Sequence, residues 1–150
     1  MNKDVIISVT GTQVNEHGET DGQELITKGS YYLKNGAYFI IYNESEITGM
    51  SGTTTFLKAE PARVTLNRTG TSEHRQVFEP GIKNLGNYVT PFGVICMAVT
   101  ASKVEVNLTD MGGSIKLKYE LEVENQKIGD NSLSLLVQQE SIDGCRHKKG

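Results

Sequence analysis

The clearest structural signal in this chain is the stretch SIKLKYELEVE, residues Ser114–Glu124. Apolar side chains occupy every second position from Ile115 to Val123, and lysines or glutamates fill the positions between them. In an α-helix the two sets would mix around the circumference, whereas in a β-strand they lie on opposite faces. The pattern therefore predicts a strand with one buried face and one face in water.

The same alternation recurs in short runs along the chain, at Val5–Val9, Val64–Leu66, Val104–Leu108 and Leu133–Val137. Turn signals separate these runs, and the strongest is Asn35-Gly36, because this pair tolerates positive φ at both central positions of a hairpin turn. No long helical pattern interrupts the series. We therefore expect an all-β fold, an antiparallel up-and-down β-barrel of about 8–10 strands that leaves no exposed edge. A two-sheet sandwich is the alternative, and the short hairpin-like connections favour the barrel.

One stretch breaks the alternation. The apolar residues from Ile95 to Val99 occupy odd positions, whereas those from Val104 to Leu108 occupy even positions. A strand with a period of two changes parity only through an extra residue. We expect a bulge, bend or tight turn near Thr100–Lys103.

Length and charge narrow the class of protein. A chain of 150 residues predicts a single barrel domain over residues 1–140, and the basic, non-periodic end at residues 141–150 predicts a flexible tail. The formal net charge of −3 argues against a nucleic-acid partner, because phosphate contacts require a surplus of Lys and Arg. The longest apolar run, Val94–Val99, is far too short to span a membrane as a helix.

The N-terminus and the cysteines predict the compartment. The N-terminal apolar run Val5–Ile7 is too short for the core of a signal peptide. The two cysteines, Cys96 and Cys145, lie far apart and form neither a disulfide framework nor a zinc-site spacing. We expect a cytoplasmic protein with reduced thiols.

Five segments in a fixed order carry a resemblance to a known family: YYLKNGAYFIIYNES, TTTFLKAEPARVTLNRTG, VFEPG, YVTPFGVICMAVTASKVEV and GGSIKLKYELEVENQKIGDNSLSLLV. Together they resemble the YwiB-like family of bacterial proteins, which have a calycin-like (lipocalin-type) β-barrel. The residues that weigh most in this resemblance are Thr54, Leu66, Arg68, Gly70, Phe78, Gly81, Tyr88, Thr90, Pro91, Gly93, Thr100 and Tyr119. The resemblance implies the fold, and it supplies no catalytic residues because the family has no established activity.

Four side chains are candidates to line the lumen or rim of such a barrel. Arg68 continues an apolar strand face towards the barrel end, where a guanidinium can bind a carboxylate or phosphate through two hydrogen bonds. The alternative for Arg68 is an ion pair with a barrel-end glutamate such as Glu79, or contact with water. Thr54 stands for the hydroxyls of the Thr-Thr-Thr run, and Tyr88 and Tyr119 contribute phenols. A small barrel can also be filled by its own side chains, so an open and a filled interior both remain alternatives.

Two residues with reactive side chains are interpreted as structural rather than functional. Cys96 lies between Ile95 and Met97, which favours core packing over a nucleophile. His74 lies beside charged neighbours at the start of a strand, which favours a solvated side chain over a metal ligand. The sequence therefore predicts no catalytic residue, no metal and no cofactor.

Two classes of function remain. The first is a non-catalytic module that binds a small, partly apolar or anionic molecule in the barrel. The second is a protein-interaction or homodimerising module with a filled barrel, which the bulky residues on both faces of Tyr38–Tyr42 favour. An enzyme is less favoured, since no acid–base pair stands out. A connected cavity of about 300 Å³ or more with convergent polar groups would favour the first class.

Overall fold

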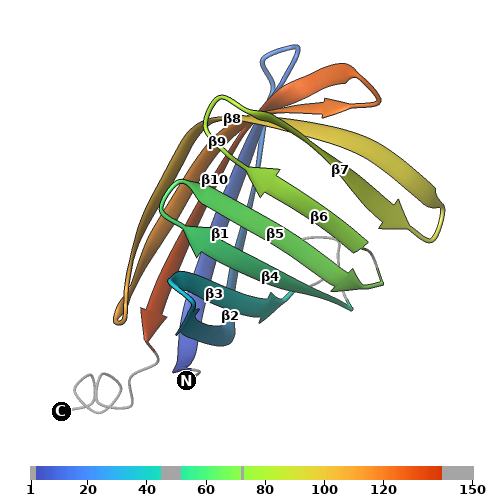
Figure 1. Cartoon of the computed structure of the whole chain (residues 1–150). Coiled ribbons are helices and arrows are strands. Elements are labelled where there is room, and N and C mark those ends of the chain that lie inside the picture. Colours follow the sequence, from blue (N-terminus) through green and yellow to red (C-terminus); the bar gives the residue numbers. More distant parts are fainter. Residues whose placement is uncertain (1–2, 45–51, 72, 140–150) are drawn as a thin grey trace.

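The computed structural model describes residues 3–44, 52–71 and 73–139, and the ten strands in these ranges form one closed barrel (Figure 1). The strands are β1 (Lys3–Asn15), β2 (Thr20–Lys34), β3 (Ala37–Asn43), β4 (Thr53–Glu60), β5 (Arg63–Gly70), β6 (Glu73–Phe78), β7 (Lys83–Thr90), β8 (Gly93–Thr109), β9 (Gly112–Val123) and β10 (Gln126–Gln139). Each strand pairs antiparallel with the next one along the chain, and β1 pairs with β10 to close the barrel. The predicted antiparallel up-and-down barrel is confirmed. The tail predicted at residues 141–150 lies outside the described residues.

Tight turns connect the strands of the β2–β3 and β9–β10 hairpins, as the sequence predicts. Asn35 and Gly36 have φ values of 53° and 81°, so both central residues of the β2–β3 turn lie in the left-handed region. Glu124 and Asn125 adopt φ values of 51° and 69° in the β9–β10 turn. This backbone twist matches the right-handed twist of the flanking strands, which keeps each hairpin in register.

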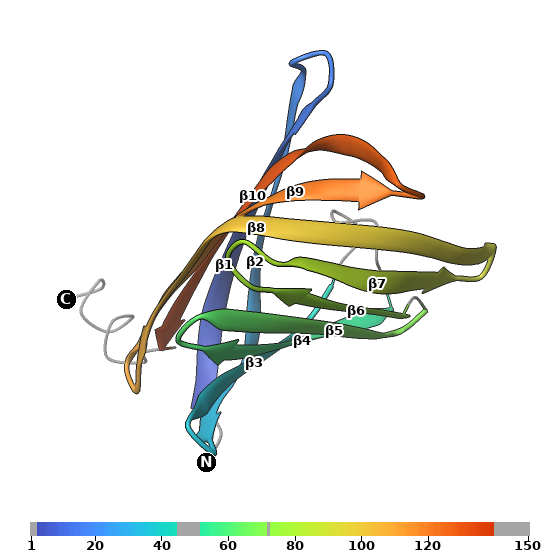
Figure 2. The same cartoon turned by 45° about the horizontal axis from the view of Figure 1, so that its top comes forward.

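The predicted break in β8 is confirmed. The register between β8 and β9 shifts between Ala101 and Lys103, so Ser102 is the extra residue. Before the shift Met97 and Val99 share the inner face, and after it the even-numbered apolar residues do. The strand bends strongly along its length (Figures 1 and 2). Because bulges bend a strand and increase its twist, this one allows β8 to follow the curve of the wall.

A packed core fills part of the barrel interior. Its large members are less than 2% exposed and come from both halves of the sequence: Ile7, Ile40, Ile115, Leu117 and Leu135. They lie on the inner faces of strands that alternate apolar and polar residues. We use the term packed core for these five residues.

Side chains close the barrel at the end that carries the β8–β9 turn, which we call the tied end. Tyr31 donates its hydroxyl hydrogen to the Thr109 carbonyl over 2.5 Å, and the Tyr38 hydroxyl donates to Asp110 Oδ1 over 3.1 Å. The two tyrosine rings stack with centroids 5.2 Å apart. Lys3 Nζ donates to the Asp110 carbonyl over 2.6 Å. The β8–β9 turn is thereby fastened to β1 and to the β2–β3 hairpin.

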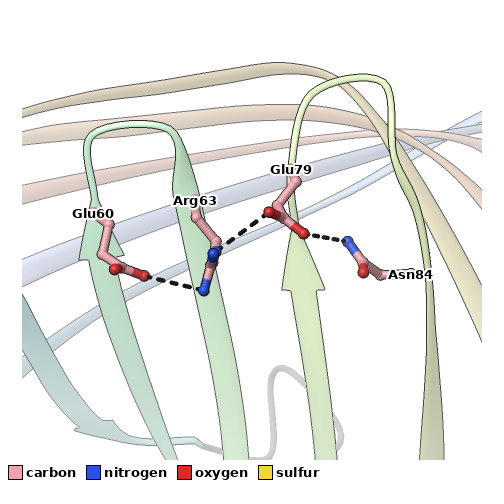
Figure 3. Close-up of polar contacts among 4 residues, drawn as sticks. All are labelled: Glu60, Arg63, Glu79 and Asn84. Carbon is pink, nitrogen blue, oxygen red and sulfur yellow. Dashed lines mark hydrogen bonds and ion pairs between the residues drawn. The ribbon is translucent and has the colours of Figure 1, made fainter.

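A second group of contacts at the tied end joins the β4–β5 and β6–β7 turns (Figure 3). Arg63 lies between two carboxylates, with Nη1 3.9 Å from Glu60 Oε1 and Nε 3.4 Å from Glu79 Oε2. Asn84 Nδ2 donates to Glu79 Oε1 over 3.3 Å. These contacts connect β4, β5 and β7. They supplement the described backbone pairing of β6 with β7, which is limited to Glu73–Val89 and His74–Tyr88.

The opposite end, which we call the open end, carries the β1–β2, β5–β6, β7–β8 and β9–β10 turns. The hairpins β1–β2, β7–β8 and β9–β10 diverge there and point in different directions (Figure 2). Phe92, at the tip of β7–β8, is 97% exposed. The sheet therefore spreads at this end, whereas side chains fasten it at the other.

The interpretation of Cys96 as a core residue is wrong, because its side chain is exposed. Met97 and Val99 face inward, so alternation places Cys96 on the outer face, where it pairs across the sheet with Asn87. The apolar neighbours Ile95 and Met97 suggested burial, but their side chains lie on the opposite face of the strand. By contrast, β3 is covered on both faces, since Ile40 is fully buried inside and Phe39 is half-buried outside by stacking on Tyr32.

Candidate functional site

Residues from five consecutive strands form one row on the inner surface near the open end. Tyr42 on β3 pairs with Thr55 on β4, Thr55 pairs with Arg68 on β5, Arg68 pairs with His74 on β6, and His74 pairs with Tyr88 on β7. Directly paired residues share a face of the sheet. The register therefore brings together polar side chains that are distant in the sequence.

A cavity of about 310 Å³ lies against this row. One part of its wall is polar, with a guanidinium, an imidazole, an amide and two phenols, and the rest is apolar. The lining residues are Leu66, Arg68, His74, Gln76, Phe78, Tyr88, Met97, Val99, Tyr119, Leu121 and Leu133. The size falls at the lower end of the range for small-molecule sites.

Two smaller cavities adjoin the first, and Leu133 lines all three. One of about 90 Å³ shares Leu66 and Arg68 with the main cavity and includes Glu44. The other, of about 200 Å³, shares Tyr119 and is lined mostly by polar residues of β1, β2 and β10, including Asp21. The hollow part of the barrel interior thus lies around Leu133, and none of the five packed-core residues lines these three cavities.

Arg68 faces the cavity and is paired with a buried carboxylate. Its Nε lies 3.6 Å from Glu44 Oε2, and the Glu44 side chain is only 2% exposed. Thr55 donates its hydroxyl hydrogen to the same Glu44 oxygen, and the Glu44 backbone N–H donates to the Thr53 carbonyl over 2.8 Å. Glu44 is therefore held in place behind Arg68. The alternative of an ion pair between Arg68 and a glutamate is confirmed, but the partner is Glu44. Glu79, which was named as an example, pairs with Arg63 at the tied end.

His74 lines the cavity wall and is half-buried, so its interpretation as a solvated side chain is wrong. Burial, and then the charge of Arg68, lower the pKa of His74 below its usual value of 6.5, although Gln76 opposes the shift. Gln76 Nε2 donates to the Asn84 carbonyl over 3.1 Å, so its Oε1 faces His74 Nε2 at 3.4 Å. A carbonyl oxygen only accepts, which assigns the proton of the neutral imidazole to Nε2.

Gln76 also explains a close approach between β6 and β7. The side chain is 1% exposed, and a Cβ on Gly86 would lie 2.5 Å from Gln76 Oε1 and 2.6 Å from the Arg75 carbonyl. Only a glycine at position 86 leaves room for this amide beside the strand. The amide thus replaces part of the missing backbone pairing along the cavity wall.

Tyr119 lies at the border between the main cavity and the adjoining polar cavity. Its ring meets Phe78 edge-on, with centroids 4.9 Å apart at 60°. Asn131 Nδ2 donates to the Tyr119 hydroxyl oxygen at 3.4 Å, which leaves the hydroxyl hydrogen available to another acceptor. Tyr88, whose ring centroid lies 5.5 Å from that of His74, completes the polar wall.

Of the four candidates, the structure brings Arg68, Tyr88 and Tyr119 to one cavity but not Thr54. Thr54 donates its hydroxyl hydrogen to Asn43 Oδ1 over 2.9 Å, and it shares the outer face of β4 with Phe56. The inward hydroxyls of this run belong to Thr53 and Thr55, which are buried.

Sequence reasoning missed Glu44, His74 and Gln76. For the last two a signal exists, because alternation back from the buried Phe78 places Gln76 and His74 on the inner face. For Glu44 no such signal exists, since it follows the last residue of β3 and its burial depends on contacts across the sheet, among them those with Thr55 and Arg68. Among the described residues no three His, Cys, Asp or Glu side chains gather as a metal site.

Comparisons with known proteins agree with this architecture. The model of a domain of unknown function, DUF1934, matches residues 7–135. The crystal structure of the ywiB protein from Bacillus subtilis superposes with a TM-score of 0.83 at 18% sequence identity, covering 93% of this chain and 94% of that chain. At that identity the likeness concerns the fold alone. None of the curated protein sequences matches the chain, and no helix in the described residues is long and apolar enough to cross a membrane.

Proposed function

This chain belongs to the DUF1934 family, and we propose that it is a non-catalytic module that binds a small, partly apolar or anionic molecule inside its barrel. The observation that carries the proposal is the cavity of about 310 Å³, into which Arg68, His74, Tyr88 and Tyr119 converge from four different strands. Small-molecule sites typically combine an apolar wall with a few placed polar groups, as this cavity does. The proposal includes the cytoplasm as the compartment.

The distribution of apolar side chains supports a ligand over a filled barrel. Phe78, Leu121 and Leu133 leave space beside them, whereas the packed core leaves none. Well-packed interiors rarely contain voids larger than a water molecule, and those that occur near convergent polar groups are candidates for occupation.

The alternative is a protein-interaction or homodimerising module. The outer face of β3, which first suggested it, has Phe39 and Ile41 half-buried among neighbouring side chains. Exposed apolar residues lie instead on the β7–β8 hairpin, where Leu85, Phe92 and Val94 are each at least 60% exposed. This hairpin is the observation that favours self-association, and it leaves the cavity unexplained.

A thermal-shift experiment on the full chain tests the proposal. A ligand at about 100 times its Kd stabilises the folded state by about 2.7 kcal/mol, which corresponds to a Tm rise of roughly 5–10 °C for a chain of this size. We expect fractions of a cellular small-molecule extract, and the compounds purified from them, to produce such a shift in the wild type.

Two matched variants locate the binding site. Leu133→Phe enlarges a side chain that lines all three cavities and abolishes the shift. Leu136→Phe makes the same change on the outer face of β10, where the leucine is 42% exposed, and keeps the shift. A shift that persists in Leu133→Phe, or its absence from every fraction with the wild type, would refute binding in the cavity.

A further inference from the structure

The charges around the cavity are already balanced. The guanidinium of Arg68 has a buried carboxylate partner, Glu44, at 3.6 Å. Glu44 is fixed by Thr55 and by a backbone hydrogen bond, so it stays with Arg68 rather than moving away from an incoming anion. A buried arginine that lacked a counterion would attract an anion strongly, but this arginine has one.

No other described residue adds a positive charge to the cavity wall. The lining residues of the main cavity include one arginine, one histidine and no carboxylate. His74 is mostly neutral at pH 7 and above, because burial and Arg68 lower its pKa below the usual 6.5. The adjoining polar cavity contributes a carboxylate, Asp21, which adds negative charge near the open end.

A charged ligand would therefore lack a counterion in this site. A carboxylate at Arg68 would bring a second negative charge close to Glu44, and an ammonium would meet the guanidinium. Transfer of an ion from water to a buried position without full compensation is strongly unfavourable. An uncharged polar group has no such cost, and it can accept from Arg68 and exchange hydrogen bonds with Tyr88 or Tyr119.

We infer that the molecule bound in the cavity is uncharged and amphipathic, with a carbonyl, amide or hydroxyl group at the Arg68–His74–Tyr88 row and an apolar body against Phe78 and Leu121. This inference rests on the proposed function and narrows it, because it selects the neutral class from the apolar and anionic molecules that the cavity alone would admit. The cavity of about 310 Å³ has the volume of roughly ten water molecules. The body is therefore the size of a single ring or a short chain, not a long lipid.

Matched pairs of small molecules test the inference on the unmodified full chain. The probes are benzoic acid and benzamide, 3-phenylpropanoic acid and 3-phenylpropanamide, and hexanoic acid and hexanamide. Titration calorimetry at pH 8 keeps all three acids ionised. We expect at least one amide to bind, and to bind at least tenfold more tightly than its acid.

The possible results separate the two proposals. An acid that binds more tightly than its amide overturns the inference and leaves binding in the cavity intact. Binding of an amide that persists in Leu133→Phe refutes the proposed site, and with it the inference. If no member of the three pairs binds, the result counts against the proposed function itself.

A charge variant tests the assigned cause. Glu44→Gln keeps the shape of the side chain and removes the charge that balances Arg68. We expect the ratio of acid affinity to amide affinity to rise at least tenfold. The control is Glu79→Gln, which removes the carboxylate partner of Arg63 at the tied end and leaves the ratio unchanged. An unchanged ratio in folded Glu44→Gln would show that Glu44 does not set the charge preference, and if this variant does not fold, the wild-type titrations alone decide.

Discussion

The packed core and the cavity wall are built from the same alternating strands, yet they differ in what their inner faces contain. In the packed core every inward residue is apolar, and Leu117 is 1% exposed. A few residues further along the same strand, Tyr119 and Leu121 line the cavity. The comparison teaches that one strand, β9, can stabilise the core with its first half and line a partly polar cavity with its second half. The stabilising core and the cavity wall, which we propose binds a ligand, thus lie in different parts of one barrel.

The largest expected effect comes from removing the same side chain from both regions of β9. Leu117→Ala leaves a cavity among well-packed neighbours, and we expect it to lower the free energy of unfolding by about 3 kcal/mol. Leu121, at 8% exposure, already borders empty space and has fewer contacts to lose. We expect Leu121→Ala to cost about 2 kcal/mol, at the lower end for buried leucines. Urea denaturation of both variants measures the difference.

The two denaturation curves must share one slope for this comparison to hold, because a changed slope would indicate a changed denatured or native state. Equal losses in the two variants would mean that the cavity wall is packed as tightly as the core. The contrast between the two regions would then be broken.

Most of the fold was predictable from local rules. The alternation in Ser114–Glu124 predicts β9, and Asn35-Gly36 predicts a hairpin turn that the φ values confirm. The parity change between Val99 and Val104 predicts the register shift at Ala101 and Lys103. These features depend on the side-chain period of a strand, which is a property of each strand alone.

The candidate site was less predictable, because it depends on register between strands. Arg68 and Tyr88 are brought together through His74, which pairs with both. Nothing within β5 or β7 alone indicates that pairing. Thr54 was misplaced for a related reason, since the Thr-Thr-Thr run has hydroxyls on both faces and only Leu57 and Ala59, both buried, mark the inner one.

A smaller effect on stability is expected from removing a tyrosine hydroxyl at the tied end, for comparison with one in the cavity wall. Tyr31 is fully buried, and burial together with nearby Tyr38 raises the pKa of its phenol, so it stays protonated and donates to the Thr109 carbonyl. Tyr31→Phe removes the hydroxyl that donates to the Thr109 carbonyl, so this carbonyl loses that hydrogen bond. We expect a loss of about 1–2 kcal/mol in the free energy of unfolding, measured by thermal denaturation.

Tyr88→Phe is the matched change at the open end. It removes the same hydroxyl from the cavity wall, where the ring keeps its contact with His74. We expect a change within about 0.5 kcal/mol. If Tyr88→Phe lowers the free energy of unfolding as much as Tyr31→Phe does, the Tyr88 hydroxyl stabilises the fold. It would then be less available for a hydrogen bond to a ligand.

The smallest expected effect is the pH dependence that His74 in the cavity wall contributes. The folded protein lowers the pKa of His74 below 6.5, so below pH 6.5 the unfolded chain binds a proton that the folded chain resists. The free energy of unfolding therefore falls as the pH drops from 6.5 towards the folded pKa, and it is fully retained above 6.5. His74→Gln should remove this part of the decline.

Urea denaturation of the wild type and His74→Gln at several pH values from 7.5 to 5 measures the effect. The control is His17→Gln, in the exposed β1–β2 turn, which should follow the wild type. If wild type and His74→Gln decline in parallel, protonation of His74 costs the folded state nothing. The imidazole would then have to reach water or a counterion, and the cavity wall would carry a positive charge as the pH falls below 6.5.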